Sequence, residues 1–90
     1  MHAVVVNVTI KDVEAATAYL REQIVPQVAQ APGLVNAYWA GAGSNGGAMI
    51  VFESEDAANA MAESIRGDEQ APEAAATIDS IEVREVVAHL

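Results

Sequence analysis

The segment AVVVNVTI, residues 3–10, constrains the fold more than any other part of the chain. Its β-branched residues favour an extended strand, in which successive side chains point to opposite faces. One face then carries His2, Val4, Val6, Val8 and Ile10, and the other carries Ala3, Val5, Asn7 and Thr9. Because both faces are largely small or apolar, both sides of this strand have to be covered in the folded protein.

The next segment has the pattern of a long amphipathic helix. Asp12 is a suitable N-cap, since its carboxylate can accept hydrogen bonds from the free amides of a first turn. Apolar residues follow at steps of three and four, and they form one stripe: Val13, Ala16, Leu20, Ile24, Val28 and Ala31. Pro26 is expected to kink this helix or to end its regular part, because it lacks the N–H that would bond to residue 22. The sequence APG at 31–33 stops the helix.

The second half of the chain repeats strand, helix and strand. Residues 34–40 and 48–54 are expected to be strands on either side of a glycine-rich loop. Ser54 caps a second helix that runs to about Arg66, with Gly67 as its terminator. The buried side of that helix is predicted to carry Ala58, Met61 and Ile65. The connection DEQAPEAAAT has no firm pattern, and residues 79–90 are expected to be the last strand.

The order of elements is therefore β-α-β-β-α-β in one domain that spans residues 1–90. With right-handed crossovers this order predicts an α+β, ferredoxin-like fold, with a four-stranded antiparallel sheet and both helices on one face. The second and third strands also carry apolar residues on both faces, such as Trp39 opposite Tyr38 and Ile50 opposite Val51. We expect a second copy of the sheet to cover the remaining face, which gives a homodimer. A charged substitution at Val5 or Val6, whichever faces the partner, should break that dimer.

The loop GAGSNGG, residues 41–47, has its glycines in the G-x-G-x-x-G spacing of a dinucleotide-binding loop. That fingerprint requires a helix directly after the loop, so that helix-terminal amides meet the pyrophosphate. A strand follows here instead, and Asn and Gly tolerate the positive φ of tight turns. The loop is interpreted as a β-hairpin with no nucleotide affinity.

Composition limits the partners. The 90 residues include no cysteine, and 13 acidic against four basic residues give a formal net charge of −9. Lys11, Arg21, Arg66 and Arg84 are too scattered to form a nucleic-acid-binding stripe, and the negative field disfavours anionic membranes. The N-terminus lacks the features of a signal peptide, and no segment approaches a membrane span. We expect a cytoplasmic protein that binds neither nucleic acid nor membrane.

Two segments carry a resemblance to a known family. The chain resembles the dimeric α+β barrel superfamily in its order of elements and in two segments, APGLVNAYW at 31–39 and AMIVFESEDAANAM at 48–61. Within it the chain is similar to small antibiotic-biosynthesis-monooxygenase-type proteins. The resemblance implies homodimers whose sheets close a barrel, and a ligand cleft between sheet and helices. If the chain is an enzyme, the resemblance implies a cofactor-independent monooxygenase-type oxidoreductase.

The haem-degrading branch of this superfamily is a poor match. Its members typically pair an Asn on the first strand with a Trp near the end of the third and a haem-ligating His on or after the second helix. Asn7 matches the first, but Phe52 occupies the place of the Trp, and no His occurs between His2 and His89. Without an axial nitrogen ligand the iron has no anchor, so haem degradation is rejected and no cofactor is expected.

A cofactor-free oxygenase would need donors for a developing oxyanion and a dry pocket. The candidate ligand-binding residues are Asn7, Asn36, Tyr38, Trp39 and Arg84, and no catalytic residue can be named. Each has a structural alternative: Asn7 satisfying a barrel neighbour, the aromatic residues filling a dimer core, Arg84 pairing with Glu82 or Glu85 of a neighbouring strand. The family register turns Asn7 toward the helices, whereas the aliphatic Val4, Val6 and Val8 are the better helix-facing set.

No metal site or catalytic dyad is expected. His2 and His89 lie on neighbouring strands, but zinc needs a third ligand that the local sequence does not supply, so both are interpreted as exposed strand ends. Glu53, Glu55 and Asp56 sit where a helix N-terminus favours negative charge. Two function classes remain: an oxygenase-like enzyme or binding protein for a small aromatic or apolar ligand, and a non-catalytic dimeric binding or regulatory module.

Overall fold

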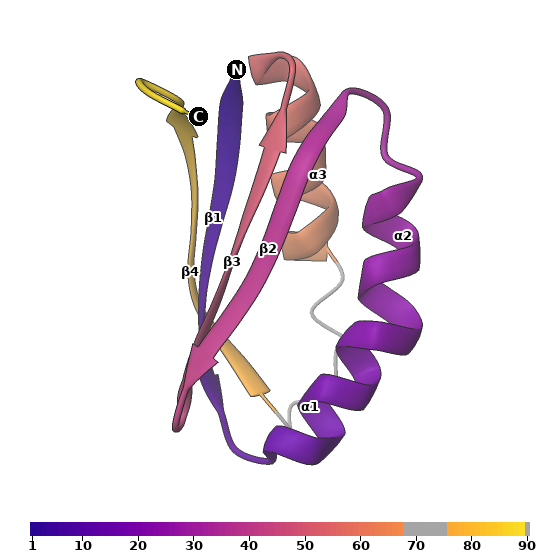
Figure 1. The fold of residues 1–90 in the computed structure, drawn as a ribbon, viewed down its shortest axis with the longest axis vertical. Coiled ribbons are helices and arrows are strands. Elements are labelled where there is room, and N and C mark those ends of the chain that lie inside the picture. The colour runs from indigo at the N-terminus through magenta and orange to yellow at the C-terminus, as the bar shows by residue number, and fades with distance from the viewer. Residues whose placement is uncertain (68–75, 90) are drawn as a thin grey trace.

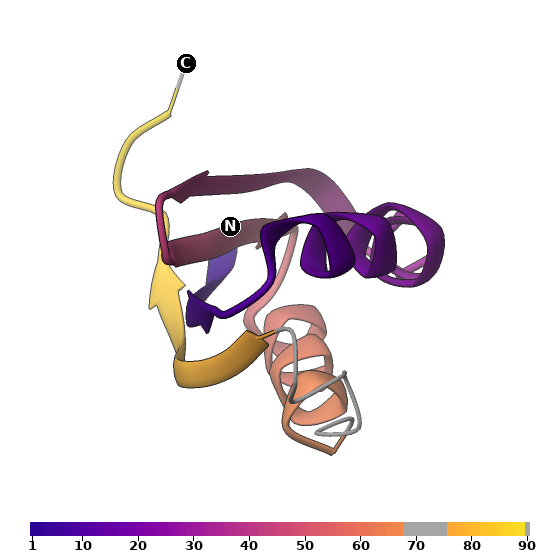
Figure 2. The ribbon, with the colours of Figure 1, turned by 90° about the horizontal axis from the view of Figure 1, so that it is seen from below.

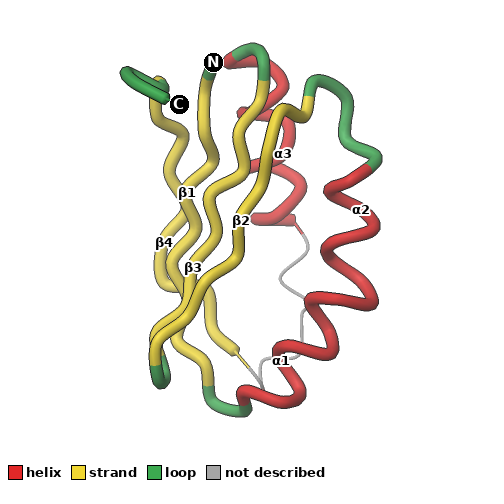
Figure 3. Tube along the Cα trace, in the orientation of Figure 1, coloured by secondary structure: helices red, strands yellow, loops and turns green. Residues whose placement is uncertain are grey.

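The computed structural model describes residues 1–67 and 76–89, which form one antiparallel sheet with helices on a single face (Figures 1 and 3). The elements in chain order are β1 (His2–Ile10), α1 (Val13–Tyr19), the π-helical segment η1 (Leu20–Ile24), α2 (Val25–Ala29), β2 (Leu34–Ala42), β3 (Asn45–Phe52), α3 (Glu55–Gly67) and β4 (Ala76–Glu85). The ferredoxin-like βαββαβ fold predicted from the sequence is confirmed.

The four strands lie in the order β2-β3-β1-β4, and every neighbouring pair is antiparallel. Strand β1 is therefore central, with Val4 opposite Ile50 on β3 and opposite Val83 on β4. Seen from below, α1 and α3 both lie on the same side of the sheet (Figure 2). The face of the sheet away from the helices is called the outer face below.

The hydrophobic core lies between the sheet and α3. Val4 and Phe52 are fully buried, and they join a cluster with Ala58 and Ala62 of α3. Val6 is 7% exposed on the same side of β1. The aliphatic set of β1 therefore faces the helices, as the residue pattern indicated, and Asn7 points to the outer face. The orientation of Asn7 implied by the family register is not observed.

Two β-bulges decide which side chains share the inner face. The pairing shifts between Asn7 and Val8 on β1, where Ser80 opposes Asn7 and Ile78 opposes Val8. Asp79 is the extra residue, so Ile78 turns to the same face as Ile81. A corresponding shift follows Leu34 on β2 and places it on the side of Trp39. Neither bulge was predicted.

The β2–β3 hairpin is tighter than the sequence suggested. Only Gly43 and Ser44 form the turn, because Gly41 pairs with Gly46 and Ala42 pairs with Asn45 within the strands. Gly43 has φ +61°, and no non-glycine residue among those described has positive φ. A positive φ at the first central position alone is the pattern of a type II′ turn. The hairpin is confirmed, but the strand ends differ from 34–40 and 48–54. Strand β2 continues to Ala42, and β3 begins at Asn45 and ends at Phe52, two residues before its predicted end.

The last strand differs from its predicted range of 79–90. It occupies Ala76–Glu85, and its ladder ends where Glu85 pairs with His2 at the start of β1. Beyond it the Val86 amide donates to the Met1 carbonyl at 2.9 Å, and Val87 is 90% exposed. A strand needs a hydrogen-bonding neighbour, so the apolar pattern after Glu85 does not continue the sheet.

The second helix agrees with its prediction. The Ala57 amide donates to Ser54 Oγ at 3.2 Å, which is an N-cap contact, and Glu55 and Asp56 occupy the first turn. Ala58 is buried and Met61 and Ile65 are half-buried, as expected. The connection after the helix lies outside the described residues. None of the described helices has the length and apolar character needed to span a membrane.

Candidate functional site

A cleft of about 640 Å³ lies between the inner face of the sheet and the first helical segment. The helical wall comes from α1, η1 and α2, and the sheet side comes mainly from β1, β2 and β3. The apolar stripe predicted for this helix lines the cleft through Val13, Ala16, Leu20, Ile24 and Val28. The predicted cleft between sheet and helices is therefore present.

The helical wall is irregular in the middle. Regular α-helix ends at Tyr19 and resumes at Val25, and the Val25 amide donates to the Leu20 carbonyl across the π-helical turn. Pro26 lies in the first turn of α2, where its missing N–H leaves no gap in the bonding. The predicted end of the regular helix is confirmed. A π-helical segment was not predicted, and such segments occur frequently at functional sites.

Small residues form part of the sheet side of the cleft. Gly41 and Gly46 are cross-strand partners, and Ala48 opposes Trp39 next to them. A Cβ added at Gly46 would lie 2.7 Å from Ile10 Cδ1 and 3.2 Å from Val8 Cγ2. The glycine at 46 therefore leaves room for the β1 side chains, and it does not serve a turn. Trp39 is the large aromatic group on the sheet side.

The polar side chains of the cleft come from its helical wall. Thr17, Tyr19 and Arg21 line it there, whereas the sheet side supplies aliphatic residues, glycines and Trp39. Among the described residues that line the cleft, none carries a carboxylate or an imidazole. The cleft can thus donate hydrogen bonds from two hydroxyls, a guanidinium and the indole N–H, and it offers no side-chain base.

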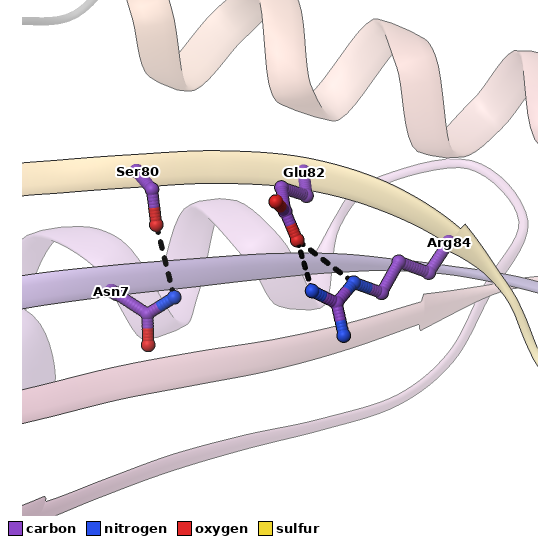
Figure 4. Close-up of polar contacts among 4 residues, drawn as sticks. All are labelled: Asn7, Ser80, Glu82 and Arg84. Carbon is purple, nitrogen blue, oxygen red and sulfur yellow. Dashed lines mark hydrogen bonds and ion pairs between the residues drawn. The ribbon is translucent and has the colours of Figure 1, made fainter.

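Trp39 is the single member of the five candidate ligand-binding residues that lines this cleft. Asn7 and Arg84 lie on the outer face, where Figure 4 shows both engaged with β4 neighbours. The Asn7 amide donates to Ser80 Oγ at 3.0 Å. Arg84 binds Glu82, with its Nε 2.8 Å from Oε2. Glu82 is on the same strand as Arg84, and not on a neighbouring one as the sequence suggested.

Asn36 and Tyr38 also face outward, on β2. The Asn36 side-chain amide donates to the Tyr38 hydroxyl at 2.9 Å, and Tyr38 is 61% exposed. Because β2 alternates, Trp39 on the inner face requires Tyr38 on the outer face. The structure therefore does not bring Asn7, Asn36, Tyr38 and Arg84 together at the cleft.

Thr17, Tyr19 and Arg21 were not singled out by sequence reasoning. Thr17 and Arg21 continue steps of four from Val13, so they flank the apolar stripe of the helix. That spacing was the available signal. It could have been used by asking which polar residues border the stripe, rather than which polar residues lie on strands.

The structure places the two histidines in different environments. His2 is less exposed than predicted: its side chain is 20% exposed, its Nε2 lies 3.6 Å from Glu55 Oε2, and its Nδ1 is buried without a hydrogen-bond partner. His89 is exposed, as predicted. Over residues 1–67 and 76–89, no group of three or more His, Asp or Glu side chains is arranged to hold a metal ion.

The fold is shared with solved structures from three bacteria. MupZ from Pseudomonas fluorescens superposes with a TM-score of 0.76 at 18% sequence identity, over 91% of this chain and 69% of MupZ. HapK from Hahella chejuensis gives 0.67 at 17% identity, over 99% of this chain and 95% of HapK. A variant of SnoaB from Streptomyces nogalater, a cofactor-independent oxygenase, gives a TM-score of 0.70 at 16% identity, over 99% of this chain and 96% of SnoaB. The chain has the fold of these proteins.

Identities this low establish the fold alone. What these structures share with the chain is the architecture that the resemblance implied, one antiparallel sheet with helices on one face. No protein-family model and no curated protein sequence matches the chain. Function therefore has to be argued from the cleft.

Proposed function

We propose that this protein binds a small aromatic molecule in the cleft between the sheet and the α1–η1–α2 segment. The cleft itself is the observation that carries this proposal. Its volume of about 640 Å³ falls within the about 300–1,000 Å³ that is usual for small-molecule sites. Its lining is mostly apolar with a few polar side chains, which is the usual composition of a ligand pocket.

Trp39 favours an aromatic ligand over a purely aliphatic one. Its indole is the largest side chain of the cleft, and it opposes Ala48, which leaves the ring face uncovered by a large cross-strand neighbour. Stacked or edge-to-face aromatic pairs gain about 0.5–1.5 kcal/mol beyond the burial of area. An aromatic ring bound between Trp39 and the aliphatic helix stripe would make apolar contacts on both of its faces.

Trp39 also supplies the test, because it is the only tryptophan in the chain. Titration with 9-anthracenemethanol, a neutral tricycle that absorbs where tryptophan emits, should quench Trp39 fluorescence in a saturable manner. Ala16→Phe would fill the cleft and should abolish the quenching. Ala18→Phe is the matched control, because Ala18 is exposed on the same helix and does not line the cleft. Equal behaviour of both variants, or no saturation, would contradict the proposal.

Cofactor-independent oxygenation is a second candidate, favoured by the fold shared with SnoaB. In such a reaction a phenolic substrate loses a proton, and its electron-rich anion reduces dioxygen. The donors of Thr17, Tyr19 and Arg21 are suited to hold the anion, whereas the described lining offers no base to take the proton. The site thus supports binding more directly than catalysis. Oxygen-electrode measurements with polycyclic phenols, without added metal or flavin, would separate a binding protein from an oxygenase.

The homodimer predicted from the sequence belongs to the outer face. Val5 and Val51 are half-buried there, and Met49 is 47% and Tyr38 61% exposed. A second copy of the same face would cover these side chains about a two-fold axis, and the cleft on the inner face would stay open in each subunit. The net charge of −9 opposes association, but it is screened within about 8 Å at physiological salt.

Val5→Asp tests that dimer, because Val5 points to the outer face and Val6 to the core. Sedimentation of the wild-type protein at micromolar concentration should report a dimer, and the variant should report monomer or aggregate. Ala18→Asp adds the same charge to an exposed helix position and should leave the dimer intact. A folded wild-type monomer would remove the homodimer from the proposal without affecting the cleft.

A further inference from the structure

Arg21 is an exposed residue that borders the cleft. It lies in η1 and lines a cleft whose other residues are mostly aliphatic. Of the remaining basic residues, Lys11 is exposed before α1 and Arg84 is bound to Glu82 on the outer face. Among the side chains that the structure describes, Arg21 therefore provides the only positive charge at the cleft.

The helix supplies no counter-charge to Arg21. Its neighbours at three- and four-residue spacing, where helical ion pairs form, are Thr17, Ala18, Ile24 and Val25. No ion pair joins Arg21 to another residue in the described part of the chain. The guanidinium therefore keeps its hydrogen-bond donors for a group from outside the protein, and in the free protein that group is water.

The hydrogen-bond donors of the cleft are distributed unevenly between its two walls. Thr17, Tyr19 and Arg21 stand on the helical wall within five residues, and Thr17 and Arg21 are one turn apart. A guanidinium donates only, and the two hydroxyls can donate beside it. The opposite wall is apolar apart from the Trp39 indole, which also donates. An apolar body against the sheet with an oxygen anion at the helical wall fits this arrangement.

We propose that the ligand of the cleft is an aromatic acid, with a carboxylate or ionised phenol as its anionic oxygen, and that Arg21 binds that oxygen. The inference rests on the proposed binding function and specifies its ligand class. Arginine binds carboxylates through two parallel N–H donors, and such charge-assisted contacts are stronger than neutral ones. Thr17, one turn before Arg21 on the same side of the helix, can add a hydroxyl donor.

The charge of the whole protein works against this ligand class. A formal net charge of −9 repels anions at long range. Exposed charges farther away than about 8 Å are largely screened at physiological salt, whereas Arg21 would act in direct contact. The direct contact with Arg21 therefore decides whether anions are preferred. A test has to separate this contact from the long-range repulsion by the net charge of the protein.

Isothermal titration with 2-naphthoate and with its neutral methyl ester makes that separation. Wild-type protein should bind the acid more tightly than the ester. Arg21→Gln should weaken the affinity for the acid by about tenfold or more, which is the expected loss of a charge-assisted contact. It should change the affinity for the ester by less than about twofold. Lys11→Gln removes the same unit of charge outside the cleft and should leave both affinities unchanged.

Each result has a defined meaning. Loss of acid affinity in Arg21→Gln alone supports the inference. Equal losses in both variants would assign the effect to the overall field, and binding of acid and ester with no effect of Arg21→Gln would place the ligand away from Arg21. Either outcome overturns the inference and leaves the proposed binding function standing. Binding of neither probe, together with no response to the neutral tricycle, overturns both.

A second probe distinguishes the two anionic groups. A nitronaphthol changes colour on ionisation, so absorbance reports its state when bound. Contact with Arg21 should lower the apparent pKa of the bound phenol relative to the free one, because a nearby cation favours the charged form. The shift should disappear in Arg21→Gln. If 2-naphthoate binds through Arg21 and the phenol shows no shift, the ligand class narrows to carboxylic acids.

Discussion

The two helical segments cover the same face of one sheet in different ways. Helix α3 packs directly on it, with Ala58 0% and Ala62 1% exposed one turn apart. Across α1, η1 and α2, Val28 is the one buried residue, and Val13 is 57% exposed. One part of the sheet face thus becomes core, and the other becomes the wall of a cleft.

The difference comes from how residue sizes are combined. Beneath α3 the large, fully buried Phe52 belongs to one core cluster with the small helix residues Ala58 and Ala62. Near α1 and η1 the sheet offers Gly41, Gly46 and Ala48. Large residues against small ones fill the space between layers, whereas glycines and alanines leave space that the helix residues only partly fill. The cleft arises where the layers are not complementary.

The largest expected effect is on the core half. Phe52→Ala should lower the free energy of unfolding by about 3–5 kcal/mol, because it removes a fully buried ring and leaves a cavity. Leu20→Ala should cost only about 1 kcal/mol, since Leu20 is half-buried beside space that already exists. Urea denaturation measures both. Equal costs would mean that the cleft is closed in solution and that the two halves do not differ.

The second effect tests the space directly by adding volume. Ala58→Leu should cost about 1–3 kcal/mol, because the added atoms have no room between α3 and the sheet. Ala16→Leu should stay within about 0.5 kcal/mol, since its side chain extends into the cleft. Thermal unfolding of the two variants provides the comparison. A large destabilisation by Ala16→Leu would contradict the open cleft.

The smallest effect concerns the two helix starts, which have equivalent caps. Ser54 accepts from the Ala57 amide at 3.2 Å, and Asp12 accepts from the Ala15 amide at 3.1 Å. Ser54→Ala should cost about 1 kcal/mol, as N-cap losses usually do. Asp12→Ala should cost about half of that in global unfolding, because α1 is poorly buried and can fray locally. The rest of the lost cap energy of Asp12→Ala should appear as local opening of α1. Native-state hydrogen exchange should detect this opening as faster exchange confined to α1.

Much of the fold could be predicted because it depends on local patterns. The order of elements, the caps at Asp12 and Ser54, the hairpin and the end of regular helix before Pro26 all follow from spacing and residue type. The exact strand ends could not be predicted, because strand pairing sets them. Glycines assigned to a loop became strand residues once partners lay opposite, and the last strand stopped where β1 begins.

The site was decided by the tertiary structure. Alternation in the sequence required Tyr38 and Trp39 to face opposite ways, and it placed Asn7 opposite Val6 and Val8. The aliphatic pattern of β1 favoured the Val6 side for the helices, whereas the family register favoured the Asn7 side. Packing selected the aliphatic side of β1, because burying Val4 and Val6 removes more apolar surface than burying Asn7 and Thr9. That choice turned Asn7, Asn36, Tyr38 and Arg84 outward and put Trp39 in the cleft with Arg21. The sequence by itself determined two faces for every strand, and only the packing of the helices decided which of them became the site, because burial is a property of the whole fold.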